Sequence, residues 1–86
     1  MYHLIQVQAV NRPGILHRIT QIVLRNQLNI ENLSLMVSEN TRLSFITLGI
    51  IFPEENNEHE AELLAKQMAK QVDIVSAQLM KATPLA

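Results

Sequence analysis

The turn Asn11-Arg12-Pro13-Gly14 is the segment whose residue types and spacing best fit ligand chemistry. Asn11 can cap a following helix by accepting a hydrogen bond from a backbone N–H group in its first turn. Pro13 fits early in a helix, and Gly14 lets another chain or a ligand approach the backbone closely. Free N–H groups and the positive end of the helix dipole would then form a small anion site suited to a carboxylate. The same residues could equally do no more than begin the helix.

The remaining polar residues give little support for catalysis or metal binding. The histidines, at 3, 17 and 59, are not spaced two to four residues apart, and the chain has no cysteine. Ser and Thr lack a surrounding glycine motif, and only two glycines are present, too few for a glycine-rich phosphate loop. Five glutamates lie between 54 and 62, where they complement the dipole of a helix start. We therefore do not expect an independent enzyme.

Composition narrows the class of protein further. The 86 residues allow one domain, and 48% hydrophobic with 17% charged residues is not the composition of a disordered chain. A net charge of −1, one tyrosine and two phenylalanines argue against nucleic-acid binding. No apolar run approaches the ~20 residues of a membrane span, and we expect no secretory signal. The lack of cysteine fits a cytoplasmic protein.

Hydrophobic periodicity predicts the elements that would position the turn. Alternating apolar residues predict four strands, over 3–10, 30–37, 43–52 and 73–81. Apolar stripes predict helices over 15–25 and 58–71, and Asn26 is expected to end the first of them in the left-handed conformation. This order predicts an α+β, ferredoxin-like βαββαβ fold, in which a four-stranded antiparallel sheet carries both helices on one face.

The alternation also assigns side chains to the two faces of the sheet. Nine apolar residues are expected to face the helices: Ile5, Val7, Ala9, Ile46, Leu48, Ile50, Val75, Ala77 and Leu79. Ten uncharged residues are expected on the opposite face: Gln6, Gln8, Asn32, Ser34, Met36, Phe45, Thr47, Gly49, Ser76 and Gln78. Because interface centres are depleted of charge, a partner is expected to cover this face, although a neutral solvated face would have the same composition.

The strand over 30–37 is expected at one edge of the sheet. Glu31 is its single charged residue, and an edge with so little charge aggregates unless another chain pairs with it. Pairing of two such edges around a two-fold axis would give a homodimer with a continuous eight-stranded sheet.

Two segments resemble the ACT domain, a small-molecule regulatory module, in their residues and in their separation along the chain: Asn11-Arg12-Pro13-Gly14-Ile15-Leu16 and Asn29-Ile30-Glu31-Asn32-Leu33. Two more, Leu43-Ser44-Phe45-Ile46-Thr47 and Lys70-Gln71-Val72-Asp73-Ile74-Val75, extend the likeness. Together they resemble the regulatory (small) subunit of acetolactate synthase, also called acetohydroxyacid synthase, in its short single-domain type. The resemblance covers 2–80, the expected ACT domain, and leaves 81–86 as a C-terminal tail. This sequence departs from the family at Phe45, where Arg is usual, and at Gln27, near which Gly is frequent.

The resemblance implies a non-catalytic subunit that binds and activates the catalytic large subunit. It would sense a branched-chain amino acid, valine, for feedback control of branched-chain amino acid biosynthesis. The effector would lie between two ACT domains of a homodimer, with its side chain against Ile15 and Ile30. Thiamine diphosphate, magnesium and FAD would belong to the catalytic partner, so this chain would hold no cofactor. The implied effector-binding residues are Asn11, Pro13, Gly14, Ile15 and Leu16, closed by Asn29 and Ile30 of the second copy.

Two alternatives remain open at this point. The chain could be an ACT-type amino-acid sensor module that regulates a different enzyme, or a stringent-response or transcriptional protein. It could also be a small enzyme or metal-binding protein built on the same fold.

Overall fold

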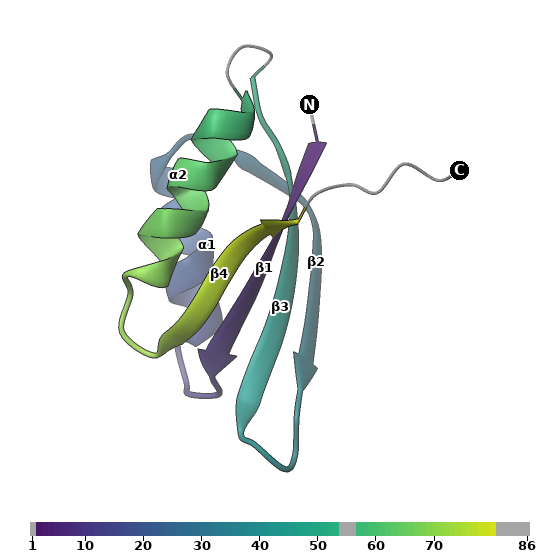
Figure 1. The fold of residues 1–86 in the computed structure, drawn as a ribbon, viewed down its shortest axis with the longest axis vertical. Helices are drawn as coiled ribbons and strands as arrows, with labels where there is room; N and C mark the ends of the chain where they lie inside the picture. Colours follow the sequence, from purple (N-terminus) through teal and green to yellow (C-terminus); the bar gives the residue numbers. More distant parts are fainter. Residues whose placement is uncertain (1, 54–56, 81–86) are drawn as a thin grey trace, which may run out of the picture.

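The computed structural model describes residues 2–53 and 57–80, and it has the predicted fold class. Four strands, β1 (Tyr2–Val10), β2 (Asn29–Val37), β3 (Leu43–Ile51) and β4 (Ile74–Met80), form one sheet in the order β2-β3-β1-β4. All of the pairs are antiparallel. Helices α1 (Ile15–Arg25) and α2 (Asn57–Ala69) both lie on one face of the sheet (Figure 1).

The predicted ends of the described elements differ from the observed ones by at most two residues. The expected tail, 81–86, and most of the loop before α2 lie outside the described residues. Among residues 2–53 and 57–80, neither helix combines the length and hydrophobicity needed to cross a bilayer.

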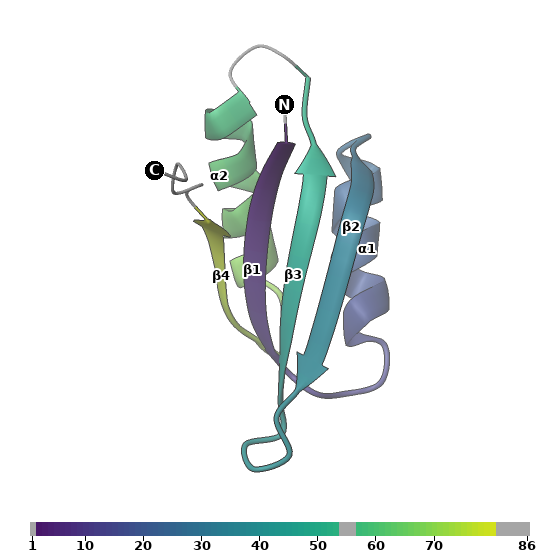
Figure 2. The same cartoon turned by 90° about the vertical axis from the view of Figure 1, so that its right-hand side faces the viewer.

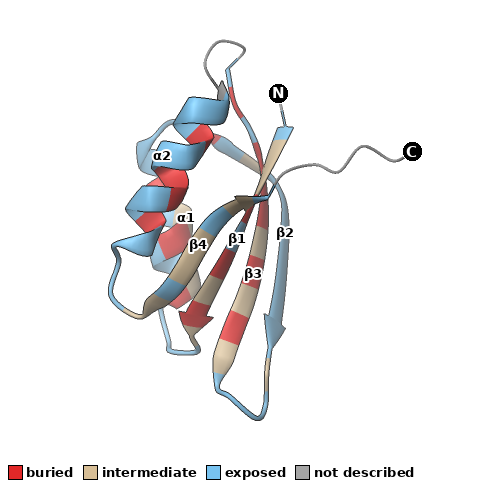
Figure 3. Cartoon of the chain, in the orientation of Figure 1, coloured by how far each residue is buried: buried red, intermediate tan, exposed pale blue. Residues whose placement is uncertain are grey.

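The core lies between the sheet and the two helices, where Figure 3 shows the buried segments facing one another. The alternation in β1 and β3 is confirmed, because all six of their predicted inward residues are fully buried. The stripe of α2 is also buried, through Ala61, Leu64, Ala65 and Met68. Burial of apolar area on this scale is the main force that holds a chain this short in one fold.

One inward residue predicted for β4 is wrong. Val75 is 57% exposed, whereas Ile74, Ala77 and Leu79 pack against the core. The cause is a bulge, since Gln8 of β1 pairs with Ser76 while the next residue, Ala9, pairs with Ile74. An extra residue in one strand reverses the face of every side chain before it, and periodicity alone does not show where that happens.

The predicted end of α1 is also corrected. Asn26 has φ −86°, and the left-handed residue is Gln27, with φ 59°. Asn26 instead uses its side chain, because Nδ2 donates to the Ile22 carbonyl at 2.7 Å and to Gln67 Oε1 at 3.0 Å. The amide therefore closes the last turn of α1 and ties it to α2, which leaves the following residue to reverse the chain.

Gly49 lies beneath the side chain of Tyr2. The Tyr2 ring lies across Gly49, so close that a Cβ at this position would overlap the phenol unless the ring moved. The absence of a Cβ thus lets the ring pack directly on the backbone of β3.

Candidate functional site

The predicted turn before α1 is a tight β-turn over Arg12–Ile15. The Ile15 N–H group donates to the Arg12 carbonyl at 3.3 Å, and Gly14 has φ 85° and ψ −5°. Proline at the second position and glycine with positive φ at the third are typical of a type II turn. Pro13 therefore belongs to the turn and not to the first turn of the helix, which corrects the prediction.

Gly14 occupies the N-cap position of α1, and no side chain caps the helix. Among the described residues, none accepts a hydrogen bond from the backbone N–H groups of Gly14 or Leu16. No acidic residue lies in the first turn, so the positive end of the helix dipole is not neutralised locally. The opening of α1 thus presents N–H donors to an anion, although the Ile15 N–H group is already engaged in the turn.

Asn11 does not cap α1, contrary to the prediction. Its Oδ1 accepts a hydrogen bond from the Ser44 hydroxyl at 3.1 Å, and its backbone N–H donates to the Arg42 carbonyl at 2.9 Å. The turn over Arg12–Ile15 carries Asn11 away from the helix and against the start of β3. Asn11 is nonetheless an exposed residue, three positions before the N-cap residue of α1, Gly14.

The same loop is anchored on its other side by the turn that precedes β4. Asp73 lies 3.3 Å from Arg12 and 3.9 Å from Arg18 in two ion pairs. Its carbonyl also accepts the Val10 N–H group at 2.8 Å. Because the arginines are exposed, the ion pairs contribute little stability, but they restrict the positions that the loop can adopt.

The two apolar residues at the start of α1 differ in what they could offer a ligand. Ile15 is 4% exposed and belongs to the core, whereas Leu16 is half-buried. An apolar ligand side chain could therefore touch Leu16 more readily than Ile15, which the resemblance had placed against the effector.

Asn29 and Ile30 lie far from this loop within one chain. Asn29 pairs with Ile51 at the start of β2, whereas Val37 at its end pairs with Ser44 beside Asn11. The eight steps along the strand from Asn29 to Val37 separate its two ends by about 27 Å, at about 3.4 Å per residue. Figure 2 shows β2 starting at the end of the molecule where α1 finishes, and finishing at the opposite end, where the loop leads into α1. A single chain thus does not bring the predicted site residues together.

The edge of the sheet formed by β2 is open along nearly its whole length. Eight of its nine residues are exposed, Ile30 being half-buried. Leu33, Leu35 and Val37 point to the helix side, opposite the inward residues of β3, yet they are 37%, 42% and 46% exposed. A bulge at Glu31 leaves a regular, uncharged stretch from Asn32 to Val37.

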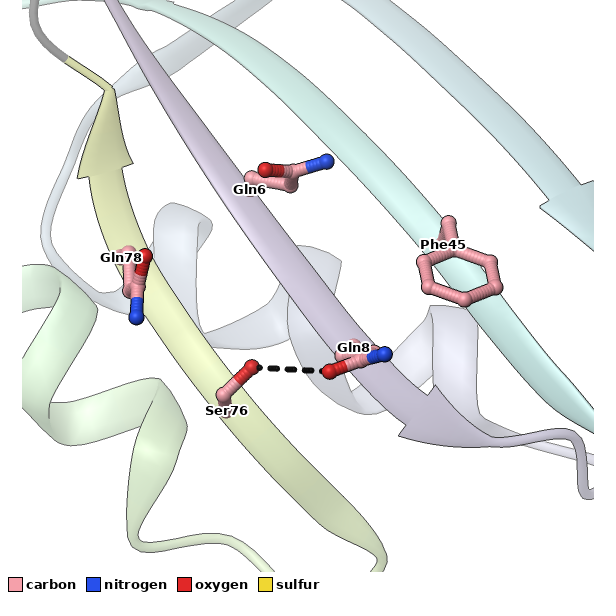
Figure 4. A pocket seen from close by; sticks show the side chains of 5 residues that line it. All are labelled: Gln6, Gln8, Phe45, Ser76 and Gln78. Carbon is pink, nitrogen blue, oxygen red and sulfur yellow. Dashed lines mark hydrogen bonds between the residues drawn. The ribbon is translucent and has the colours of Figure 1, made fainter.

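The open face of the sheet carries the predicted uncharged side chains. Figure 4 shows five of them, from β4, β1 and β3, around a hollow of about 210 Å³. The Ser76 hydroxyl donates to Gln8 Oε1 at 3.3 Å across its floor. Phe45 stands at the rim and also lines a neighbouring hollow with Met36. Within residues 2–53 and 57–80, no three acidic or histidine side chains gather in an arrangement that could hold a metal ion.

Comparison with known proteins gives a consistent set of relatives. Residues 5–76 match the family described as AHAS small subunit-like ACT domain. The chain is also 35% identical, over 75 residues, to the acetolactate synthase small subunit of Bacillus subtilis (strain 168). That alignment covers 87% of this chain and 42% of the relative, so the chain spans less than half the length of that protein.

Solved structures give the same fold. The acetolactate synthase small subunit from Thermotoga maritima has a TM-score of 0.77 and 23% identity, covering 98% of this chain and 50% of that one. The ACT domain from GTP pyrophosphokinase of Chlorobium tepidum has a TM-score of 0.75 and 14% identity, covering all of this chain and 92% of that one. At such identities the likeness concerns the fold alone.

Proposed function

We propose that this chain, which belongs to the family of AHAS small subunit-like ACT domains, is a non-catalytic regulatory subunit of acetolactate synthase. It would bind and activate the catalytic large subunit in the cytoplasm and sense valine for feedback control. The observation that carries the proposal is the opening of α1, where unpaired N–H donors follow the exposed residue Asn11 in a chain with this family match.

The donors at the opening of α1 suit the carboxylate of a free amino acid. The N–H groups of Gly14 and Leu16 and the uncompensated dipole favour a small anion at that position. Asn11 would add its side-chain amide, and half-buried Leu16 would contact the aliphatic part of the ligand. A branched-chain amino acid combines a carboxylate and an apolar side chain within this small span.

A second copy of the chain would complete the site. A two-fold axis near Leu33 would run two β2 edges antiparallel and bring Asn29 of the partner subunit opposite Val37. Val37 pairs with Ser44, which holds Asn11. The two halves of the predicted site, which lie at opposite ends of β2 in one chain, would then meet twice in a symmetric homodimer. The exposed leucines of β2 would be covered in the same step.

The open face of the sheet is our candidate for the contact with the large subunit. It presents amide, hydroxyl and apolar groups without a charged residue in its central set, as the centres of protein interfaces do. Valine bound between two copies would favour one relative orientation, and the large subunit would respond only if it binds that orientation differently. Thiamine diphosphate, magnesium and FAD would remain on the large subunit.

Calorimetric titration of the 86-residue chain with valine, leucine and isoleucine tests the sensor role. We expect one valine per chain and a loss of binding in Asn11→Asp, because a second carboxylate repels that of the ligand. Asn40→Asp in the exposed β2–β3 turn is the matched control and should bind as the wild type does. No binding of any of the three amino acids would contradict the sensor role.

Co-purification with an acetolactate synthase large subunit, followed by an activity assay with and without valine, tests the partner. We expect recovery of the complex, higher activity than the large subunit alone, and inhibition by valine. Recovery of a different enzyme or of a transcriptional protein in place of the large subunit would favour the alternative sensor role.

A further inference from the structure

Ser44 is a polar residue at a position that the alternation of β3 assigns to the core. It is in phase with the buried Ile46 and Leu48, and it is itself 0% exposed. Among the described residues it is the one buried polar side chain. A hydroxyl in such a place is costly unless it is hydrogen-bonded, so its partner indicates why the residue is there.

The partner is the amide of Asn11, and the bond fixes which way that amide points. Within the described residues, the Ser44 hydroxyl has no other acceptor than Asn11 Oδ1, at 3.1 Å. Turning the amide over would place two N–H donors against a buried hydroxyl and leave its proton unpaired, at the cost of an unsatisfied buried donor. The oxygen therefore faces Ser44, and Nδ2 faces outward.

We infer that Ser44 is a positioning residue of the proposed effector site, whose buried hydroxyl holds the Asn11 amide with Nδ2 directed outward. This inference rests on the proposed function. Asn11 Nδ2 and the N–H groups of Gly14 and Leu16 then form a set of donors that suits a carboxylate. The α-ammonium group would be bound elsewhere in the site, and β2 of the second copy is our candidate for it.

A double-mutant cycle separates this role from a structural one. In the wild-type background, Ser44→Ala should weaken valine binding about tenfold, the effect of one hydrogen bond of ordinary strength. In the Asn11→Ala background, the same change should alter valine affinity less than about twofold, because Ser44 acts through Asn11. Ser76→Ala is the matched control, since its hydroxyl also bonds a side-chain amide but on the open face. Thermal unfolding verifies that each variant is folded. Ser44→Cys keeps a weak donor, so its valine affinity should lie between those of the wild type and Ser44→Ala.

Two further readouts test the orientation of the amide. Isovalerate, which lacks the ammonium group, should compete with valine in the titration, whereas isobutylamine, which lacks the carboxylate, should not. Without any ligand, Ser44→Ala should shift the side-chain amide resonances of Asn11 in a ¹H–¹⁵N spectrum, and Ser76→Ala should leave them unchanged.

The possible failures are distinguishable. A wild-type chain that binds none of the branched-chain amino acids would overturn the proposed function. A wild-type chain that binds valine would support the proposed function. If Ser44→Ala then reduced valine affinity equally in the wild-type and Asn11→Ala backgrounds, the role of Ser44 would be overturned. Competition by isobutylamine but not by isovalerate would overturn the assignment of the ligand carboxylate to these donors.

Discussion

The two edges of the sheet, β2 and β4, are built differently although neither contains more than one charged residue. α2 packs along β4, so that Ala77 and Leu79 are partly buried, and the charged Glu62 and Lys66 of α2 line a hollow beside this edge. The leucines of β2, by contrast, remain exposed although they point to the helix side. α2 thus flanks the β4 edge, whereas no helix covers the leucines of the β2 edge within the described residues.

The bulges strengthen this difference. In β4 the extra residue, Val75, lies near the start of a strand of only seven residues and points away from the core. In β2 the bulge at Glu31 is followed by six regular residues without a charge. Bulges and nearby charged side chains commonly protect an edge strand from pairing with another chain. Because β4 has both and β2 is regular from Asn32 to Val37, the geometry favours β2 as the edge that pairs.

The largest effect is expected from a charge placed on the β2 edge. Leu35→Lys should weaken the proposed homodimer at least about 100-fold, because the ammonium group would be buried without a partner at the seam. The matched change Val75→Lys on β4, at a residue of similar exposure, should leave the dimer intact. Analytical ultracentrifugation over a concentration series measures both, and equal behaviour of the two variants would contradict the distinction between the edges.

A smaller effect is expected at Asn29, which β2 would contribute to the valine site of the other copy in the proposed homodimer. Asn29→Ala should weaken valine binding about tenfold by removing one ligand contact. Asn32→Ala, on the same strand but on the open face, should leave valine affinity unchanged. Calorimetric titration gives both values, and a larger loss for Asn32 than for Asn29 would place the ligand elsewhere.

Gln27 before β2 and Asp73 before β4 both have positive φ. Substitutions at these two residues should change the free energy of unfolding in opposite directions. Gln27, with φ 59°, is exposed, and within the described residues its side chain makes no hydrogen bond or ion pair that glycine would lose. Gln27→Gly should therefore raise the free energy of unfolding by up to about 1 kcal/mol, because glycine adopts this conformation without strain. Denaturant titration measures the change, and a clear destabilisation would show that the side chain has a role at the start of β2.

Asp73, with φ 68°, precedes β4 and is the more anchored of the two. Asp73→Asn tolerates the same backbone conformation but loses both ion pairs, so stability should fall by about 0.5 kcal/mol in low salt. High salt should reduce this difference by screening the pairs in the wild type. A loss that does not depend on salt would indicate that hydrogen bonding, not charge, holds the loop.

The sequence allowed the elements and most of the core to be predicted, because a two-residue or 3.6-residue period follows directly from strand and helix geometry. The prediction failed at Val75, where a bulge breaks the two-residue period. It also failed at Asn11 and Asn26, whose side-chain amides make hydrogen bonds that the pattern does not show. The hydrogen bond of Ser44 could have been predicted in part, because a serine in phase with buried isoleucines indicates a buried, hydrogen-bonded hydroxyl. Its partner lies 33 residues away, which only the folded chain reveals.

The most direct test is to measure whether valine binding changes the dissociation constant of the dimer. If valine binds between two copies paired through β2, each event must strengthen the other by the same factor. Sedimentation equilibrium with and without saturating valine should therefore give a lower dimer dissociation constant when valine is present, and Leu35→Lys should bind valine more weakly than the wild type. A dimer dissociation constant that valine leaves unchanged, in a chain that nevertheless binds valine, would contradict a site shared between two copies.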